Sequence, residues 1–189
     1  LVKILAANLD IFLVLGYPFR QSAKLYNALS VIKKRECLGV YLKQCLPNYQ
    51  VFDEHRYFAP GSDPLVLELL GTRCAFTICE DLWESGPIQQ AKSAGAQLAV
   101  NINASPFHIN KLVERKELLS KRCKQAGFPI LYVNLIGGQD ELVFDGGSMA
   151  ANAEGECCFL APSYVEGLYS LEILVSQDGR IEIPHKSIA

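Results

Sequence analysis

Short apolar segments recur along this chain, and turn-forming residues separate them, which favours many strands over a few long helices. Ile11–Leu15 is predicted to be a fully buried strand, stopped by Gly16-Tyr17-Pro18. Ala28–Ile32 and Leu38–Leu42 are predicted to pair around the charged turn Lys33–Glu36. The first quarter of the chain is therefore expected to be all strand.

The rhythm changes in the middle of the sequence. Leu65–Leu70 and Cys74–Ile78 are predicted to pair around Gly71-Thr72. Pro87–Ser93 then suits a short helix, with proline near its first turn and a glycine as its stop. Leu98–Ile102 is again a strand.

A longer helix is predicted next, with Asn110 as its cap and an end near Ala126, before Gly127. Its apolar residues share one face at helical spacing: Leu112, Leu119, Cys123 and Ala126. Three further strands are expected: Ile130–Val133, Cys157–Leu160 and Tyr169–Val175. Buried strands that alternate with helices predict an α/β fold of packed layers, and two sheets face to face with helices outside fit this count.

The bulk composition excludes several classes of function. The 189 residues suffice for one domain, and a net charge of −2 gives no basic field for nucleic acid or an anionic membrane. No apolar run is long enough to cross a bilayer, and no secretory signal is visible. The seven cysteines include no C-x-x-C pair, so we expect free thiols and a cytoplasmic location. Because the first residue is Leu1, the true start is expected upstream.

Cys79 lies where a nucleophile would be placed. It follows the apolar strand Cys74–Ile78 directly, and a sharp strand-to-helix turn exposes a side chain close to backbone N–H groups. A buried structural thiol is the alternative, since most free cysteines are small hydrophobes. Glu80 and Asp81 come next, and two acidic residues suit a core poorly, which favours a functional role.

Lys43 ends a predicted strand and is a second candidate. A solvated surface lysine is the default. A buried ammonium beside a thiol would instead favour the thiolate and stabilise an oxyanion. Downstream, Glu54 lies among aromatic and charged residues; the segment is either an exposed loop or the source of an acid/base carboxylate.

Polar residues also follow the strand Leu98–Ile102, from Asn101 to His108, at a strand end that often lines a site in α/β proteins. Helix capping by Ser105 or Asn110 explains them equally well. A Cys–His hydrolase, with His108 as the base, is therefore a further alternative. The glycine-containing segments at 137–141 and 145–148 are expected to be tight loops and match no nucleotide-binding motif.

Taken together, these segments resemble the nitrilase superfamily, and more narrowly the glutaminase domain of glutamine-dependent NAD synthetases. The resemblance runs from about Leu25 to about Pro162. Four stretches carry it: K-Q-C-L-P-N-Y-Q-V-F-D-E-H-R-Y-F (43–58), T-I-C-E-D-L-W (77–83), N-I-N-A-S-P-F-H-I-N-K (101–111) and Y-V-N-L-I-G-G-Q-D-E-L-V-F-D-G-G-S (132–148). The last two are the most specific.

The resemblance implies an α-β-β-α sandwich, incomplete on its N-terminal side, and a Glu–Lys–Cys triad. By motif match Cys79 is the nucleophile and Lys43 the lysine, and glutamine is the substrate. The resemblance further implies substrate-binding roles for Tyr49, Glu80, Ser105 and Lys111, and a supporting role for Glu54. No cofactor or metal is expected in this domain.

The match breaks at the triad glutamate, which the family carries in P-E-L shortly before G-Y-P. An ungapped alignment on Gly16-Tyr17-Pro18 puts Ile11 at that position. The family also has a helix and a strand between G-Y-P and L-Y-N, where this chain has only the six residues 19–24. Either residues are missing from the sequence here or the protein lacks the base. We favour the first and predict that the full gene encodes a glutamate in this region.

Residues 1–175 are expected to form the glutaminase (carbon–nitrogen hydrolase) domain, and residues 176–189 to begin a linker to a synthetase domain outside this sequence. No S-G-G-x-D-S loop occurs here, so ATP and Mg²⁺ are implied only for that partner domain. A homo-oligomer is expected. Two alternatives stay open: another nitrilase-type amidase or carbamoylase, and a catalytically silent scaffold without the triad glutamate.

Overall fold

The computed structural model describes residues 8–186. Its elements, in chain order, are β1 (Phe12–Gln21), β2 (Lys24–Lys33), β3 (Glu36–Leu42), η1 (Glu54–Arg56), β4 (Leu65–Leu69), β5 (Thr72–Ile78), η2 (Cys79–Leu82), α2 (Ser85–Ser93), β6 (Leu98–Asn103), α3 (Lys111–Ala126), β7 (Ile130–Asn134), β8 (Ile136–Gln139), β9 (Leu142–Asp145), β10 (Met149–Ala151), β11 (Cys157–Leu160), β12 (Leu174–Val175) and β13 (Ile181–Glu182). The predicted strand pairs β2–β3 and β4–β5 are both present and antiparallel.

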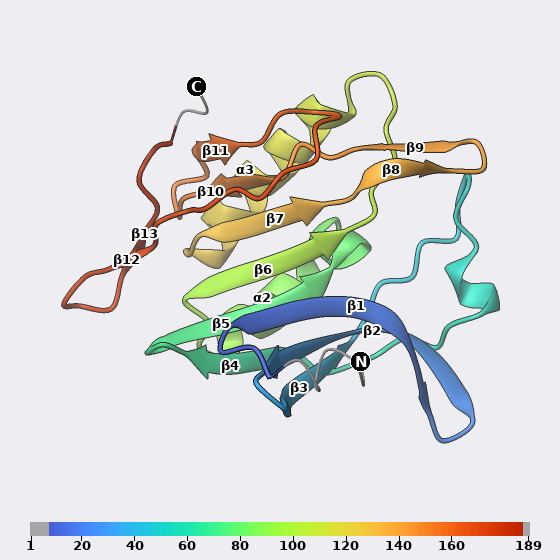
Figure 1. Ribbon diagram of the computed structural model, residues 1–189, viewed down its shortest axis with the longest axis horizontal. Coiled ribbons are helices and arrows are strands. Elements are labelled where there is room, and N and C mark those ends of the chain that lie inside the picture. Colours follow the sequence, from blue (N-terminus) through green and yellow to red (C-terminus); the bar gives the residue numbers. More distant parts are fainter. Residues whose placement is uncertain (1–7, 187–189) are drawn as a thin grey trace.

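The described residues form three layers (Figure 1). The central layer is a six-stranded sheet of order β11-β10-β7-β6-β5-β4, in which β5, β6 and β7 are parallel. Helices α2 and α3 cover one face, and the three-stranded sheet β1-β2-β3 covers part of the other. The α/β class with two sheets face to face and helices outside is therefore confirmed.

Side-chain alternation along β5 explains the layering. Cys74, Phe76 and Ile78 share a buried cluster with Leu29 of β2. Ala75, one residue out of phase, packs in the helix-side cluster instead. Because successive residues of a strand point to opposite faces, a continuous apolar run such as this one is covered on both sides.

Helix α3 has the predicted bounds. Leu119, Cys123 and Ala126 are buried on its inner face, and Gly127 adopts the left-handed conformation that ends a helix (φ 79°). The prediction that Asn110 caps the helix is correct in position only. Its backbone is left-handed (φ 70°), and its side chain makes no capping hydrogen bond.

The prediction for the first strand is wrong in its end and in its burial. β1 continues through Gly16-Tyr17-Pro18 to Gln21 and is only partly buried. Pro18 is tolerated because β1 is an edge strand of the described sheet, where a missing N–H leaves no ladder bond unmade. Gly16 is suited by close packing, since a Cβ there would lie 3.1 Å from Cδ1 of Ile102.

Within this sequence, β1 turns directly into β2, so neither a helix nor a further strand lies between Pro18 and Leu25. β1 pairs with β2 over its whole length, with Pro18 opposite Asn27 and a tight turn after Gln21. Gly16-Tyr17-Pro18 therefore lies within a hairpin strand. Among the described residues, helices cover only one side of the two sheets, so the expected α-β-β-α sandwich is incomplete, as predicted. Ile11, which the ungapped alignment put in place of the triad glutamate, is 54% exposed.

Two later predictions also need correction. Of Tyr169–Val175, only Leu174–Val175 forms a strand, paired with β13, while Tyr169 packs on a buried cluster without a strand partner. Of the expected loops, 137–141 is mostly the hairpin β8–β9, whereas 145–148 is a tight loop between β9 and β10, as predicted. Both errors concern short antiparallel pairs of strands that lie close together in the sequence, where β-propensity is a weak guide.

The proposed boundary at residue 175 stays a prediction. Residues just beyond it pack against the body: Ile181 and Ile183 are buried, and Gln97 Nε2 donates to the carbonyl of Gly179 at 2.9 Å. No helix among residues 8–186 is long and apolar enough to cross a membrane.

Candidate active site

Cys79 begins η2 directly after β5, as the sequence predicted, with its backbone in the left-handed region (φ 45°). For a residue with a Cβ this conformation costs about 1–2 kcal/mol, and such strain is typical of residues held in place for function. Its side chain lines a cavity of about 370 Å³. The thiol is thus presented to a cavity on a strained strand-to-helix turn.

Lys43 follows β3 and is only 2% exposed, so the default expectation of a surface lysine is wrong. Its Nζ lies 2.7 Å from Oε2 of Glu54, which η1 supplies. The other oxygen of Glu54 accepts a hydrogen bond from Nδ2 of Asn27 at 3.1 Å. Cys79, Lys43, Glu54 and Asn27 all line the same cavity, so the structure brings an ammonium and a carboxylate to the thiol.

The electrostatics of the cavity act mainly against the thiolate. Burial raises the pKa of Cys79 to about 11, Lys43 opposes this, and Glu80, Glu54 and Asp81 add to it. At neutral pH the resting side chain is therefore a thiol. A nucleophilic role for this thiol would need a proton acceptor, and Glu54 is the carboxylate that lines the cavity in the described part of the chain.

Tyr49 and Glu80 form a pair in the segments that follow Lys43 and Cys79. The Tyr49 hydroxyl donates to Oε1 of Glu80 at 2.9 Å, and Tyr49 is 49% exposed. Burial raises the pKa of Glu80, opposed by the Tyr49 hydrogen bond and by Lys43. The pair presents a partly exposed carboxylate suited to an ammonium group.

Lys111 and Ser105, the other predicted contacts, do not line this cavity. Lys111 begins α3, with its Nζ 3.3 Å from Oε2 of Glu114 and 3.9 Å from the centre of the Trp83 ring. Ser105 is buried, and its Oγ accepts from Nε of Arg115 at 3.2 Å. In this state the Ser105 hydroxyl is engaged within the protein.

The sequence reasoning missed a buried ion pair next to Ser105. Arg115 of α3 donates from NH1 to both oxygens of Asp145, at 2.7 and 3.0 Å, and from NH2 to the carbonyls of Ser105 and Pro106. An arginine within the apolar stripe of the predicted helix, three residues after Leu112, was the available signal. The pair fixes the loop after β6.

Of the strand-end polar residues, Asn103 lines the cavity and Asn101 does not. Asn101 is fully buried and donates to Oγ1 of Thr77 at 2.9 Å, so its role is within the sheet. His108 lies outside the cavity: its Nε2 is 3.4 Å from Oε2 of Glu114, and its side chain is 50% exposed. The structure gives the Cys–His alternative no support.

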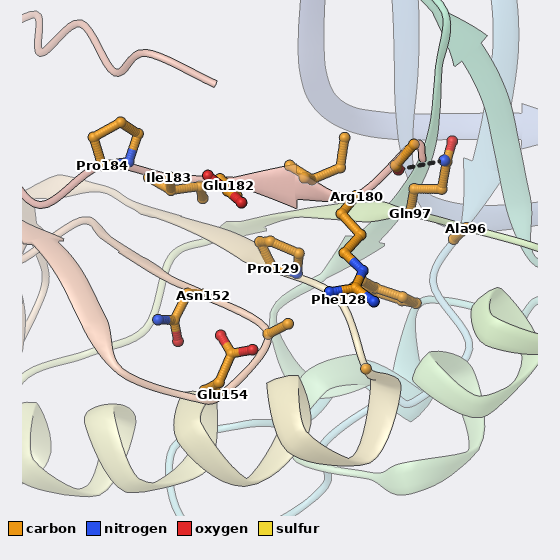
Figure 2. Close-up of a pocket in the computed structure, with 14 residues that line it drawn as sticks. Ala96, Gln97, Phe128, Pro129, Asn152, Glu154, Arg180, Glu182, Ile183 and Pro184 are labelled. Atoms are coloured by element: carbon orange, nitrogen blue, oxygen red, sulfur yellow. Dashed lines mark hydrogen bonds between the residues drawn. The ribbon is translucent and has the colours of Figure 1, made fainter. Parts of the chain in front are cut away.

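A larger cavity, of about 700 Å³, lies away from Cys79 between the β12–β13 segment and the body (Figure 2). Phe128, Asn152, Glu154 and Arg180 contribute to its lining, and it contains neither a cysteine nor a lysine. All seven cysteines are free thiols, and residues 8–186 contain no cluster of three or more potential metal ligands. The larger cavity therefore offers neither a thiol nor an ammonium from lysine.

Comparison with known proteins was made on this basis. A carbon–nitrogen hydrolase family profile matches residues 1–177. The chain is 43% identical, over 167 residues, to a glutamine-dependent NAD(+) synthetase of Aquifex aeolicus, covering 88% of this chain and 29% of that protein. It is 39% identical to the corresponding protein of Thermotoga maritima, covering 93% and 31%. The chain thus spans about a third of the length of these relatives.

Two solved structures of similar proteins have the same fold as this chain. The glutamine-dependent NAD+ synthetase of Acinetobacter baumannii, solved with ADP, superposes with a TM-score of 0.91 at 38% identity, over all of this chain and 36% of that one. A mutant amidase of Nesterenkonia sp. AN1, in which acrylamide has added to the active-site cysteine, superposes with a TM-score of 0.72 at 26% identity, covering 81% of this chain and 59% of that one.

Proposed function

Because the chain belongs to the carbon–nitrogen hydrolase family, we propose that it hydrolyses the side-chain amide of glutamine to glutamate and ammonia. The observation that carries the proposal is the shared cavity of Cys79, Lys43 and Glu54. A thiol, a buried ammonium and a carboxylate are the groups that covalent amide hydrolysis needs: a nucleophile, an oxyanion partner and a proton carrier.

The chemistry proceeds in two stages. Loss of the thiol proton lets Cys79 sulfur attack the amide carbon, and the C=O electron pair moves onto oxygen. The Lys43 ammonium and the backbone N–H of Glu80 hold that oxyanion. The tetrahedral intermediate then collapses and the C–N bond breaks. The proton taken from the Cys79 thiol is returned to the leaving nitrogen, which departs as ammonia. Water then attacks the γ-glutamyl thioester and regenerates the thiol.

The remaining predicted residues would position the amino acid. Glu80, held by Tyr49, suits the α-ammonium of glutamine, and Lys111 suits its carboxylate; Ser105 would serve the substrate through the loop that it anchors. Glu54 orients Lys43, as its 2.7 Å contact supports. The triad glutamate that the family resemblance implies is not among the described residues that line the cavity, and its presence in the full gene stays our prediction.

The similar proteins are longer than this chain, which supports a role for this reaction within a larger enzyme. We propose that the chain acts within a glutamine-dependent NAD synthetase, in which a synthetase domain of the same polypeptide uses ATP and Mg²⁺ to amidate deamido-NAD with the released ammonia. By itself the chain would yield glutamate and ammonia. A cytoplasmic homo-oligomer remains our expectation.

The test compares ammonia release from glutamine, from N-carbamoyl amino acids and from aliphatic amides, using the full-length protein and its Cys79→Ala variant. We expect glutamine to be preferred and activity to vanish in the variant. Preference for a carbamoyl or aliphatic substrate would identify another amidase of the family. A well-folded protein on which a glutamine-analogue electrophile leaves no Cys79 adduct would be a scaffold, and the proposal would fail.

A further inference from the structure

The carboxylate of Asp81 is the most heavily hydrogen-bonded acidic group beside Cys79, although it is fully buried (0% exposed). Its Oδ1 accepts the backbone N–H groups of Gln44 and Cys45, at 3.0 and 2.8 Å. Its Oδ2 accepts the backbone N–H of Ile78 at 3.0 Å and the hydroxyl of Tyr41 at 2.9 Å. Burial, the larger effect, raises the pKa of this carboxyl, whereas these hydrogen-bond donors lower that pKa and favour the ionised carboxylate.

The positions of these donors matter more than their number. Gln44 and Cys45 directly follow Lys43, and Ile78 directly precedes Cys79. β3, which leads to Lys43, and β5, which leads to Cys79, belong to different sheets, so no strand ladder joins them. One buried carboxylate therefore connects the segment that carries the ammonium with the turn that carries the thiol.

We infer that Asp81 is a positioning residue that holds the Lys43 segment against the Cys79 turn, so that ammonium and thiol face one cavity. The inference rests on the proposed function, in which Lys43 and Cys79 act on the same carbonyl. Asp81 itself does not line the cavity and would not touch the substrate.

The charges that face Cys79 determine in which direction its alkylation rate should change when Asp81 is replaced. Lys43 lowers the pKa of the thiol, whereas Glu80, Glu54 and Asp81 raise it. If Asp81 acted only through its charge, removing that charge would lower the thiol pKa and speed alkylation. If it positions Lys43, losing it withdraws the stabilising ammonium and slows alkylation. The two roles predict opposite changes.

Asp81→Asn is the informative substitution because it keeps the shape and removes the charge. One oxygen becomes an NH₂ group, and it must then face at least one backbone N–H donor, of Ile78 or of Gln44 and Cys45. Two donors cannot satisfy each other, so the connection between the two segments opens.

The experiment measures the rate of Cys79 alkylation by iodoacetamide between pH 7 and 10 in the full-length protein, with tandem mass spectrometry to separate Cys79 from Cys74. Raising a thiol pKa by one unit cuts the thiolate fraction tenfold and restores about threefold in nucleophilicity, a net loss of about three- to fourfold. We expect Lys43→Met and Asp81→Asn each to slow Cys79 by about this factor or more, and the double variant to be no slower than Lys43→Met.

Matched readouts separate positioning from general loss of stability. Ile88→Val loosens the core beneath α2, where Ile88 is fully buried, and should lower the melting temperature without changing the Cys79 rate. In glutamine hydrolysis, Asp81→Asn should lower kcat and leave KM nearly unchanged. If Asp81→Asn does not fold, Tyr41→Phe removes one of the four donors and should still slow Cys79 relative to Ile88→Val.

Several results would overturn the positioning role or the pairing on which it rests. Faster alkylation in Asp81→Asn, an additive double variant, or an unchanged rate in whichever of Asp81→Asn and Tyr41→Phe folds, would overturn the positioning role. An unchanged rate in Lys43→Met would instead overturn the Lys43–Cys79 pairing of the proposed function, and the inference with it.

Discussion

The ion pair between Lys43 and Glu54 makes the strongest quantitative prediction. Its partners are 2.7 Å apart, and their side chains are 2% and 20% exposed. Removing one member of a buried pair leaves an uncompensated charge and typically costs 3–5 kcal/mol. Glu54→Gln strands the ammonium in the less exposed position, so we expect a loss of about 3 kcal/mol in the free energy of unfolding.

Lys43→Met should cost less, about 1–2 kcal/mol, because the Glu54 carboxylate is partly exposed and keeps its hydrogen bond from Asn27. The double variant leaves no stranded charge and should lose only about 2 kcal/mol, which is a coupling of about 2–3 kcal/mol. Urea unfolding measures all three values. For a domain of this size, Glu54→Gln should melt about 6–12 °C lower.

The control is an ion pair of the same segment that lies in solvent. Asp53 and Arg56 are 3.7 Å apart, with side chains 55% and 68% exposed. Asp53→Asn should change stability by no more than about 0.5 kcal/mol. If the two substitutions at Lys43 and Glu54 add to within about 0.5 kcal/mol, the pair is not coupled and the reasoning from burial is wrong.

Three further predictions follow from other contacts. Arg115→Met, which strands the 2% exposed Asp145, should cost about 3–5 kcal/mol in urea unfolding, and adding Asp145→Leu should recover part of it; an additive pair would contradict this. Because the pKa of Cys79 is raised to about 11, its alkylation rate should rise about tenfold per pH unit from pH 7 to 10, and a plateau below pH 8 would refute the raised value. Gly155→Ala should destabilise more than Gly71→Ala, since both have positive φ but only at Gly155 does a Cβ meet backbone, at 2.6 Å, so equal melting temperatures would count against the clash.

Local pattern was sufficient for most elements and for the main candidates. The helical period of Leu112, Leu119 and Cys123 predicted α3 with correct bounds. Cys79 was found because a nucleophile elbow has a local signature, a residue placed directly after an apolar strand. Lys43 was identified mainly from the family resemblance, because the adjacent residues do not predict that its side chain is buried.

The failures concern residues whose partners lie far along the chain. Asp81 was judged poor core chemistry, yet it is fully buried, because donors from the distant segment 41–45 join the nearby N–H of Ile78 around it. A strand was predicted to end before Gly16-Tyr17-Pro18, whereas β1 continues through these residues, since an edge position tolerates proline. Such pairings depend on tertiary context, which no window of sequence contains.

The raised pKa of Cys79 has a consequence for how readily its sulfur is oxidised. Peroxide attacks the thiolate, and sulfinic and sulfonic acids form irreversibly from a sulfur that is deprotonated and accessible. A thiol whose pKa is raised to about 11 by burial and surrounding carboxylates exposes almost no thiolate between turnovers. In the proposed mechanism, the environment that makes a base necessary would also slow the oxidation of Cys79 between turnovers.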